Sequence, residues 1–366
     1  MGQRILLHVD LDAFFASVEQ IALDIDASIP LIIGSDPLEG RGRGIVSTCN
    51  YAARNFGIRS AMPISEAWKR CPGNPHGSAI YQQPRFTIYR RASNRVMKIL
   101  KINSDRFEQV SIDEAVLDIT LVCKSDYDLA LAFAKNKQSL ILEKTGLSAS
   151  IGIGSTRVLS KIASNLNKPS GLTLIDSNRI GSSIDELPLD MIPSIGPKAS
   201  TRLAEFDLIK IGDARNSGSS ILEEALGELR GEWLWRAIEG ETNAEVSAIK
   251  TRKSIGKEKT FRYDVSNDLV IYDTLEILSK DVHGRLKLLN AEAKTIEVKI
   301  RYQGFETIVH SRTLLVATSH FRPIMNVAKK LVSDIFSSKR PVRLIGIRLS
   351  NFQSCDNTQA LLFEEE

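Results

Sequence analysis

The sequence has little of what holds disulfide-bonded, zinc-bound or membrane proteins together. It contains 4 cysteines among 366 residues, with no Cys-x-x-Cys pair and no histidine at ligand spacing. No apolar run reaches the length that crosses a bilayer, and the run at 5–9 is too short for a signal sequence. We therefore expect a reduced, cytoplasmic protein without structural zinc and without a membrane partner.

Aromatic residues are also scarce, at 6%, whereas the 43% apolar and 25% charged contents are ordinary for a globular protein. A chain of this length exceeds what one hydrophobic core supports, so several compact units are expected. Residues 254–350 hold 17 Lys/Arg against 10 Asp/Glu, while the last sixteen residues carry four acids and no base. The basic block suits a polyanionic partner, although a solvated helix face produces similar counts.

Acidic residues interrupt two apolar segments of the first half. Residues 5–10 form an apolar run that ends in Asp10, and the segment after it has a helical pattern. Residues 107–119 are rich in β-branched and apolar residues but contain the pair Asp113-Glu114. This pattern predicts a strand with a carboxylate at its C-terminal end and a tight hairpin with acids at its bend.

The remaining elements of the first half complete a sheet. A helix is expected at 85–101, a second helix at 127–144 and a strand at 148–153. The order is then β-α-β-β-α-β, which predicts an α+β fold with helices on one face of the sheet.

The second half has a different pattern. Prolines and short helical stretches continue to about Gly240, and residues 241–253 form a polar linker that ends in basic residues. Beyond it, two helical patterns flank a strand in which apolar Ile296 to Tyr302 alternate with charged residues. We expect a small helical unit, a linker and an α+β domain from Ser254.

The carboxylates suggest a specific chemistry. Joining a nucleotide to a 3′-hydroxyl requires activation of the attacking oxygen and neutralisation of the departing pyrophosphate, and two Mg²⁺ ions do both. Magnesium prefers carboxylate oxygens and keeps substrate phosphates in its shell. Asp10, Asp113 and Glu114 meet that requirement if the strand bends at the acidic pair, since neighbouring strand residues otherwise face opposite sides. Three solvated loop acids are the alternative.

Three separated motifs resemble the Y-family DNA polymerases, and within them the DNA polymerase IV (DinB) branch. They are His8 to Glu19 (HVDLDAFFASVE), Ser111 to Ala115 (SIDEA) and Lys161 to Pro169 (KIASNLNKP). The resemblance runs in order from about residue 4 to 350. It implies a multidomain α+β protein with a palm, small fingers, a helical thumb with a helix-hairpin-helix, and an α+β little finger.

The resemblance assigns roles around the acids. It implies that Asp10 and Asp113 bind the two Mg²⁺ ions and that Glu114 completes the site. Asp12 lies in the same motif but is no ligand in the family, and we expect it to start the helix near Phe14. Phe15 occupies the position of the steric gate, an aromatic ring that excludes a 2′-hydroxyl.

Further residues are implied to bind the incoming triphosphate. The segment from Asn50 to Ile58 resembles the fingers motif, in which Tyr51 offers a hydroxyl and Arg54 a planar fork for phosphate oxygens. Lys161 is implied to reach the same phosphates from the palm. The run Gly152 to Ser155 resembles a phosphate loop only weakly, because no lysine follows at the required position, and we expect a strand end there.

The second half carries the implied DNA contacts. Residues 192–198 resemble the hairpin of a helix-hairpin-helix, which would hold a phosphate near Gly196 and Lys198. Ser194 stands where the family usually has glycine, which puts a positive φ there in doubt. The little finger would grip the duplex through basic strand faces such as Lys299 and Arg301, with salt-sensitive, sequence-independent binding.

The C-terminal tail resembles the short peptide by which bacterial polymerases dock on the sliding clamp. Gln359, Leu362 and Phe363 would be its anchors, and a simple apolar end is the alternative. The expected domains are the palm at 1–19 and 80–170, the fingers at 20–79, the thumb at 171–240, the linker at 241–253, the little finger at 254–350 and the clamp-binding tail at 351–366.

The sequence thus predicts a monomeric, template-directed DNA polymerase that binds primed DNA and dNTPs. No further acid cluster suggests proofreading, so we expect low fidelity and copying of damaged DNA. The alternatives are a catalytically silent homologue that acts as a clamp or scaffold adaptor, and a nucleotidyl cyclase. The three retained acids disfavour the first, and the helical unit, basic domain and tail disfavour the second.

Overall fold

The computed structural model describes residues 3–242, 244–247 and 252–354. The chain divides into two compact units, Met1–Ile249 and Lys250–Glu366. The three residues Gln359, Leu362 and Phe363 of the predicted clamp motif lie outside the described residues. None of the described helices is long and apolar enough to cross a membrane.

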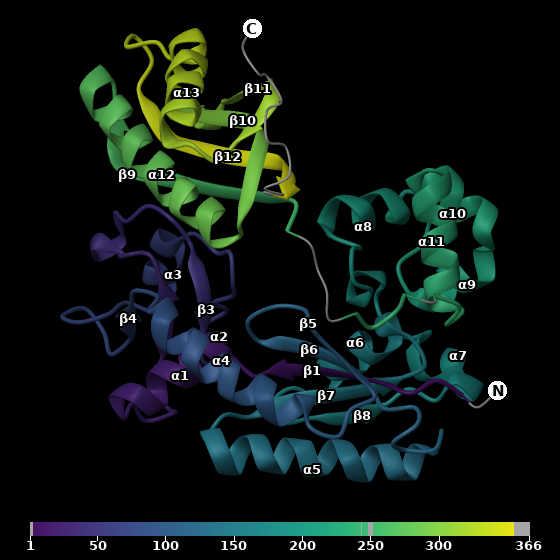
Figure 1. Ribbon diagram of the computed structural model, residues 1–366. Helices are drawn as coiled ribbons and strands as arrows, with labels where there is room; N and C mark the ends of the chain where they lie inside the picture. The colour runs from purple at the N-terminus through teal and green to yellow at the C-terminus, as the bar shows by residue number, and fades with distance from the viewer. Residues whose placement is uncertain (1–2, 243, 248–251, 355–366) are drawn as a thin grey trace, which may run out of the picture. The chain divides into compact units, whose positions relative to one another are not determined.

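A five-stranded sheet forms the centre of the first unit, in the order β5-β6-β1-β7-β8 (Figure 1). Its middle strand β1 (Leu6–Leu11) is buried along its whole length. It pairs antiparallel with β6 (Glu114–Asp118) on one side and β7 (Ala149–Gly154) on the other. With α4 (Phe86–Lys101), β5 (Arg106–Gln109) and α5 (Tyr127–Thr145), these strands confirm the predicted β-α-β-β-α-β order.

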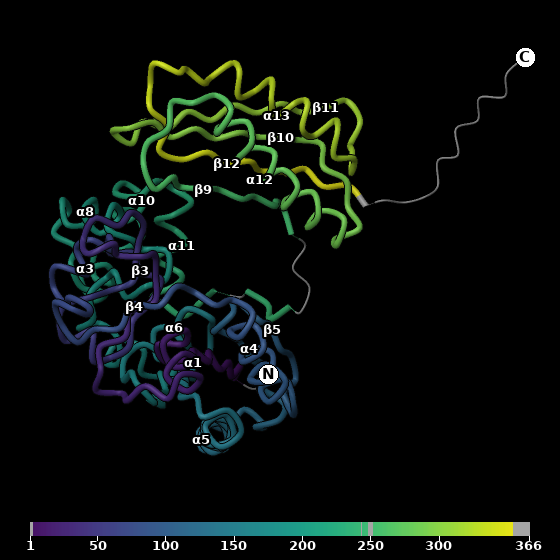
Figure 2. Tube along the Cα trace, turned by 90° about the vertical axis from the view of Figure 1, so that its left-hand side faces the viewer, coloured from purple at the N-terminus to yellow at the C-terminus, as the bar shows by residue number. Residues whose placement is uncertain are grey.

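The two faces of this sheet are covered by different helices. Ile151 and Ile153 belong to the core that also contains apolar residues of α4 and α5. Gly152 lies between them and faces the opposite side, where a Cβ would come within 2.1 Å of Ser160 O on α6 (Arg157–Leu166). The expectation of helices on one face only is therefore wrong, because Gly152 and Gly154 leave a smooth surface on which α6 packs closely. Figure 2 looks along the axis of α5, one of the two helices on the face that carries Ile151 and Ile153.

The segment after β1 builds a smaller part of the same unit. Helix α1 (Phe14–Leu23) follows the sheet strand directly, and its first residue, Phe14, is buried. A three-stranded sheet in the order β3-β2-β4 then has its own apolar core. Its elements are β2 (Leu31–Gly34), η1 (Leu38–Gly40), β3 (Val46–Cys49), α2 (Tyr51–Arg54), α3 (Ile64–Arg70) and β4 (Ile80–Gln82).

Short helices follow the edge strand β8 (Leu172–Leu174), as the sequence predicted. They share a core with α6, so α6 links them to the sheet. Ser194 has φ 77°, so the backbone adopts the positive φ despite the missing glycine. The elements are η2 (Ser177–Arg179), α7 (Ile180–Ile184), η3 (Leu189–Met191), α8 (Pro197–Ala204), α9 (Ile211–Ser217), α10 (Ser219–Leu226) and α11 (Glu228–Ile238).

The second unit is an antiparallel sheet in the order β11-β10-β12-β9, with two helices. Along β10, Ile296, Val298, Ile300 and Tyr302 are buried and the charged residues between them are half-buried, which confirms the predicted alternation. The elements are β9 (Ser254–Val265), α12 (Asp268–Leu288), β10 (Ala291–Tyr302), η4 (Gln303–Phe305), β11 (Thr307–Thr318), α13 (Phe321–Ile335) and β12 (Val342–Ser354).

Candidate active site

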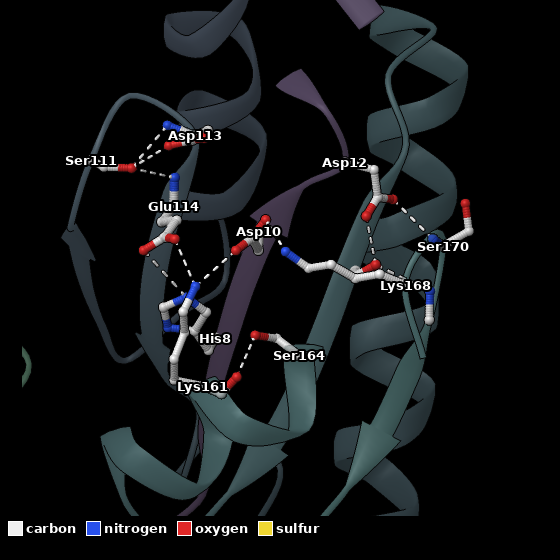
Figure 3. A network of polar contacts seen from close by, with 12 residues as sticks. His8, Asp10, Asp12, Ser111, Asp113, Glu114, Lys161, Ser164, Lys168 and Ser170 are labelled. Atoms are coloured by element: carbon white, nitrogen blue, oxygen red, sulfur yellow. Dashed lines mark hydrogen bonds and ion pairs between the residues drawn. The ribbon is translucent and has the colours of Figure 1, made fainter. Parts of the chain in front are cut away.

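Strand pairing places two of the predicted acids opposite each other. Asp10 on β1 and Glu114 on β6 are cross-strand partners, and the backbone N–H of Leu11 donates to the carbonyl of Asp113 at 3.0 Å. Asp113 lies in the bend before β6, not in the strand, so the alternation of strand residues does not turn it away from Glu114. Asp10 and Glu114 therefore face each other on neighbouring strands, and Asp113 lies in the adjoining bend with its carboxylate bonded to Ser111 (Figure 3).

Ser111 fixes the bend that carries the acidic pair. Its Oγ donates to Oδ1 of Asp113 and accepts from the backbone N–H groups of Asp113 and Glu114, at 3.2 and 3.0 Å. A serine hydroxyl that bonds to the backbone of the following residues stabilises a turn of this kind. Hydrogen bonds within residues 111–114 therefore stabilise the bend.

Two lysines form ion pairs with Asp10 and Glu114. Lys161 Nζ on α6 lies 2.8 Å from Oδ2 of Asp10 and 2.6 Å from Oε1 of Glu114. Lys168 Nζ, beyond the end of α6, lies 2.5 Å from Oδ1 of Asp10. The sequence resemblance implies a phosphate role for Lys161 but none for Lys168, although both residues lie in the same motif. Both oxygens of Asp10 are therefore paired with ammonium groups.

His8 also lies at the site, although the sequence did not predict a role for it. It is buried on β1, two residues before Asp10 and on the same face of the strand. Its Nε2 lies 3.6 Å from Oε2 of Glu114, and that nitrogen has no hydrogen-bond partner. The ligand atoms of His8, Asp10 and Glu114 lie within 4.8 Å of one another, as a metal site requires.

The charges of the site shift the pKa values of its members. Burial lowers the pKa of His8, so the imidazole is neutral at pH 7. The neighbouring imidazole of His8 and the ammonium of Lys161 lower the pKa of Glu114 against the effect of burial. Burial also opposes the charge of Lys161, but Asp10 and Glu114 raise the pKa of this lysine overall.

Asp113 behaves differently from Glu114. Burial raises its pKa, and the negative charges of Asp10 and Glu114 add to the effect. Asp113 has no lysine partner among the residues that the structure describes. No ammonium group of the described residues therefore balances the charge of Asp113.

Asp12 does not have the expected role. The N-cap of α1 is Ala13, and no side chain caps this helix. The carboxylate of Asp12 is instead buried between β7 and the segment after α6, where it accepts hydrogen bonds from Ser150 and Ser170. The helix-start interpretation is wrong because the chain turns at Ala13, in the left-handed region, and the Asp12 side chain bonds elsewhere.

Phe15 lies in an aromatic cluster at the start of α1. Its ring stacks on Tyr89 of α4 with centroids 4.4 Å apart and an interplanar angle of 12°. Tyr89 Oη donates to Oε1 of Glu19 at 2.6 Å, and the fully buried Glu19 also pairs with Arg85. Phe14, by contrast, is almost wholly buried. The half-buried ring of Phe15 therefore packs against Tyr89, which is itself held by its hydrogen bond to Glu19.

The two predicted triphosphate ligands lie at either end of α2. Asn50 caps this helix by accepting a hydrogen bond from the N–H of Ala53 at 3.0 Å. The Arg54 guanidinium lies 4.5 Å from the centre of the Tyr51 ring, and Tyr51 Oη is buried without a hydrogen-bond partner. Burial and the charges of Asp12 and Asp10 raise the pKa of Tyr51.

The other predicted contact residues belong to different elements of the chain. Gly196 caps the N-terminus of α8, and Lys198 is in its first turn. Lys299 and Arg301 belong to the second unit. Lys299 pairs with Glu258 at 2.5 Å, and Arg301 donates to Thr307 Oγ at 2.8 Å.

Comparison with known proteins gives the family. The impB/mucB/samB family model matches residues 9–165, and the model of this family's C-terminal domain matches residues 252–362. A DNA polymerase IV of Methanoculleus marisnigri is 38% identical over 99% of this chain and 98% of its own length. The chain belongs to the Y-family DNA polymerases. It is a DNA-directed DNA polymerase that binds DNA.

Further relatives and solved structures agree. A DNA polymerase IV of Clostridium perfringens is 35% identical over 96% of this polymerase and 95% of the relative. A Y-family chimera of Dbh and Dpo4 has a TM-score of 0.86 at 28% identity and covers 96% of this polymerase and 99% of that chain. An insertion ternary complex of Dbh DNA polymerase has a TM-score of 0.67 at 27% identity, with the same coverage.

Proposed function

We propose that this polymerase copies damaged DNA with low fidelity, by transferring a nucleotide from dNTP to the primer 3′-hydroxyl with two Mg²⁺ ions. The pairing of Asp10 with Glu114 across two strands, with Asp113 in the adjoining bend, carries the proposal. Low fidelity follows from the sequence, which offers no second acid cluster for proofreading.

The donor set suits two hard cations. Three carboxylates would supply the oxygen ligands that Mg²⁺ prefers, and the ammonium groups of Lys161 and Lys168 pair with two of them, Asp10 and Glu114. Asp10, Asp113 and Glu114 would hold the ions, which lower the pKa of the attacking hydroxyl and neutralise the leaving pyrophosphate. His8 would limit the positions open to Glu114.

Lysines and fingers residues would bind the triphosphate. Lys161 and Lys168, which pair with Asp10 and Glu114, would bind phosphate oxygens when their ammonium groups leave the carboxylates. Arg54 would add a planar fork and Tyr51 a hydroxyl donor that lacks a partner in the described chain. Phe15, held against Tyr89, would exclude a 2′-hydroxyl from the sugar position.

The domain assignment follows the family. We propose the palm at 1–19 and 80–170, the fingers at 20–79, the thumb at 171–240 and the little finger at 254–350, joined by the linker at 241–253. The α8 N-terminus at Gly196 and Lys198 would hold one DNA phosphate, and Lys299 and Arg301 would contact others. The tail at 351–366 would bind a sliding clamp through Gln359, Leu362 and Phe363.

The central test is primer extension with Mg²⁺. Asp113→Ala should abolish extension while binding to primed DNA persists, because the substitution removes a ligand but no basic residue. Asp128→Ala, which removes an exposed acid from the first turn of α5, is the matched control and should extend normally. Extension that survives Asp113→Ala would refute the metal assignment.

Three further assays test the finer assignments. Phe15→Ala should admit ribonucleotides, and unchanged sugar selection would remove its gate role. Templates with defined lesions should be copied, and complete arrest at every lesion would contradict translesion synthesis. Deletion of 359–363 should reduce clamp-stimulated synthesis but not basal synthesis, whereas equal loss of both would indicate misfolding.

A further inference from the structure

The carboxylate of Asp12 is buried and paired only with uncharged donors. Its side chain accepts from Ser150 Oγ at 2.7 Å and from the backbone N–H of Ser170 at 2.9 Å. Asp12 is 2% exposed, and no lysine or arginine of the described chain forms an ion pair with it. Burial of an unpaired carboxylate is unfavourable, so these two hydrogen bonds must be strong to maintain it.

The segment that Asp12 holds has an unusual backbone. Ser170 has φ 56°, in the left-handed region that favours glycine. A Cβ on the next residue, Gly171, would lie 2.2 Å from Asn167 O, so the turn is tight. Gln138 of α5 donates to the carbonyls of Ser170 and Gly171, at 3.0 and 3.2 Å. Side chains from two directions therefore fix this turn.

This turn carries Lys168. Helix α6 ends at Leu166, so the helix backbone positions Lys161 but not Lys168. Figure 3 shows Lys168 reaching Asp10 from the segment that Ser170 and Asp12 hold. The position of the Lys168 ammonium therefore depends on the turn, to which Asp12 and Gln138 both bind.

We propose that Asp12 is a positioning residue that holds the turn at 167–171 so that Lys168 stays at the acid cluster and meets the incoming triphosphate. The phosphate part of this inference rests on the proposed function; the placement of Lys168 does not. Asp12 itself touches neither metal nor substrate.

Lysine labelling tests the placement without any catalysis. The full-length protein is treated with a water-soluble acylating reagent, and the rates at Lys168 and Lys161 are measured by peptide mass spectrometry. Asp12→Ala should raise the Lys168 rate about tenfold, which corresponds to the loss of one hydrogen bond to a charged group. The Lys161 rate should change less than about twofold, because α6 holds that residue.

Two further variants keep this test decisive. Asp12→Asn retains an acceptor oxygen and should restore most of the protection if Asp12→Ala folds poorly. Asp126→Asn is the matched control, since its carboxylate also accepts backbone N–H groups but caps α5. Equal exposure of Lys161 and Lys168 would indicate general loosening and overturn the proposal, as would unchanged labelling of Lys168 in Asp12→Ala.

Single-turnover insertion tests the consequence for nucleotide binding. Asp12→Ala should raise the apparent Kd for dNTP about tenfold, and it should have no further effect in a Lys168→Ala background. Effects that multiply in the double variant would overturn the coupling. A wild-type protein that never extends a primer would refute the proposed function, whereas the labelling result would still decide the role of Asp12.

Discussion

Replacement of Lys161 by methionine should change stability and metal affinity in opposite directions. The ammonium bonds to Asp10 and Glu114, and the three side chains are 20%, 10% and 26% exposed. A hydrogen bond to a charged group contributes about 1.5–3 kcal/mol. Because these groups are partly solvated, we expect a net loss of about 2 kcal/mol in the free energy of unfolding without metal.

The same substitution should favour a divalent ion. In the wild-type protein an incoming ion must displace the ammonium from the oxygens that would bind it, and this displacement opposes binding. In Lys161→Met this opposing ion pair is absent. If its loss removes about 1.4 kcal/mol of the cost of metal binding, the variant should bind Mn²⁺ about tenfold more tightly than the wild type. Free Mn²⁺ measured by electron paramagnetic resonance, without DNA or nucleotide, gives the affinity.

Urea unfolding with and without Mn²⁺ completes this test, because Lys161→Met should be less stable than the wild type without the ion and gain more from it. Lys280→Met is the control, since its partner Glu276 is an exposed neighbour one helical turn away and the pair contributes little. The reasoning would be refuted if Lys161→Met lost stability but bound Mn²⁺ no more tightly than the wild type.

Three other predictions concern the folded state. Ser194→Gly should raise the free energy of unfolding by about 0.5 kcal/mol, since relief at φ 77° exceeds the entropy cost of glycine; a loss in urea titrations would contradict this. Burial lowers the pKa of His8 below 6.5, so the unfolded chain takes up a proton first as the pH drops. The free energy of unfolding should then fall below pH 6.5, by up to about 1.4 kcal/mol for each unit by which the pKa is lowered. His8→Phe should remove this pH dependence, and parallel pH–stability curves for the variant and the wild type would contradict the prediction. Gly152→Ala should cost about 3 kcal/mol because its Cβ would meet Ser160 O at 2.1 Å, and thermal melting equal to the wild type would refute that clash.

The sequence predicted the sheet because its signals are local. The apolar run before Asp10 and the interrupted hairpin around Asp113 define strands whose ends carry acids. The second helical face was missed, although Gly152 and Gly154, two residues apart, face the same side of a strand and leave it smooth. That inference requires knowledge of which helix packs there, which depends on the whole chain.

The missed site residues depend on tertiary contacts in the same way. His8 and Asp10 share a strand face, so alternation could have placed His8 at the site. Lys168 follows the end of a helix, and no pattern determines where its side chain points. Asp12 looks like a helix cap by position, and only the neighbouring strand and turn show what its carboxylate binds.

The chain just before the second unit is fastened to the first. Val246 is buried against Leu6 and Val116, and the N–H of Ser247 donates to the Glu108 carboxylate at 3.1 Å. Residues 246 and 247 of the predicted linker are therefore held by contacts with the first unit. Extra residues inserted ahead of Val246 would form a surface loop and leave the length of the connection to the second unit unchanged. The same residues inserted after Ser247 would lengthen that connection.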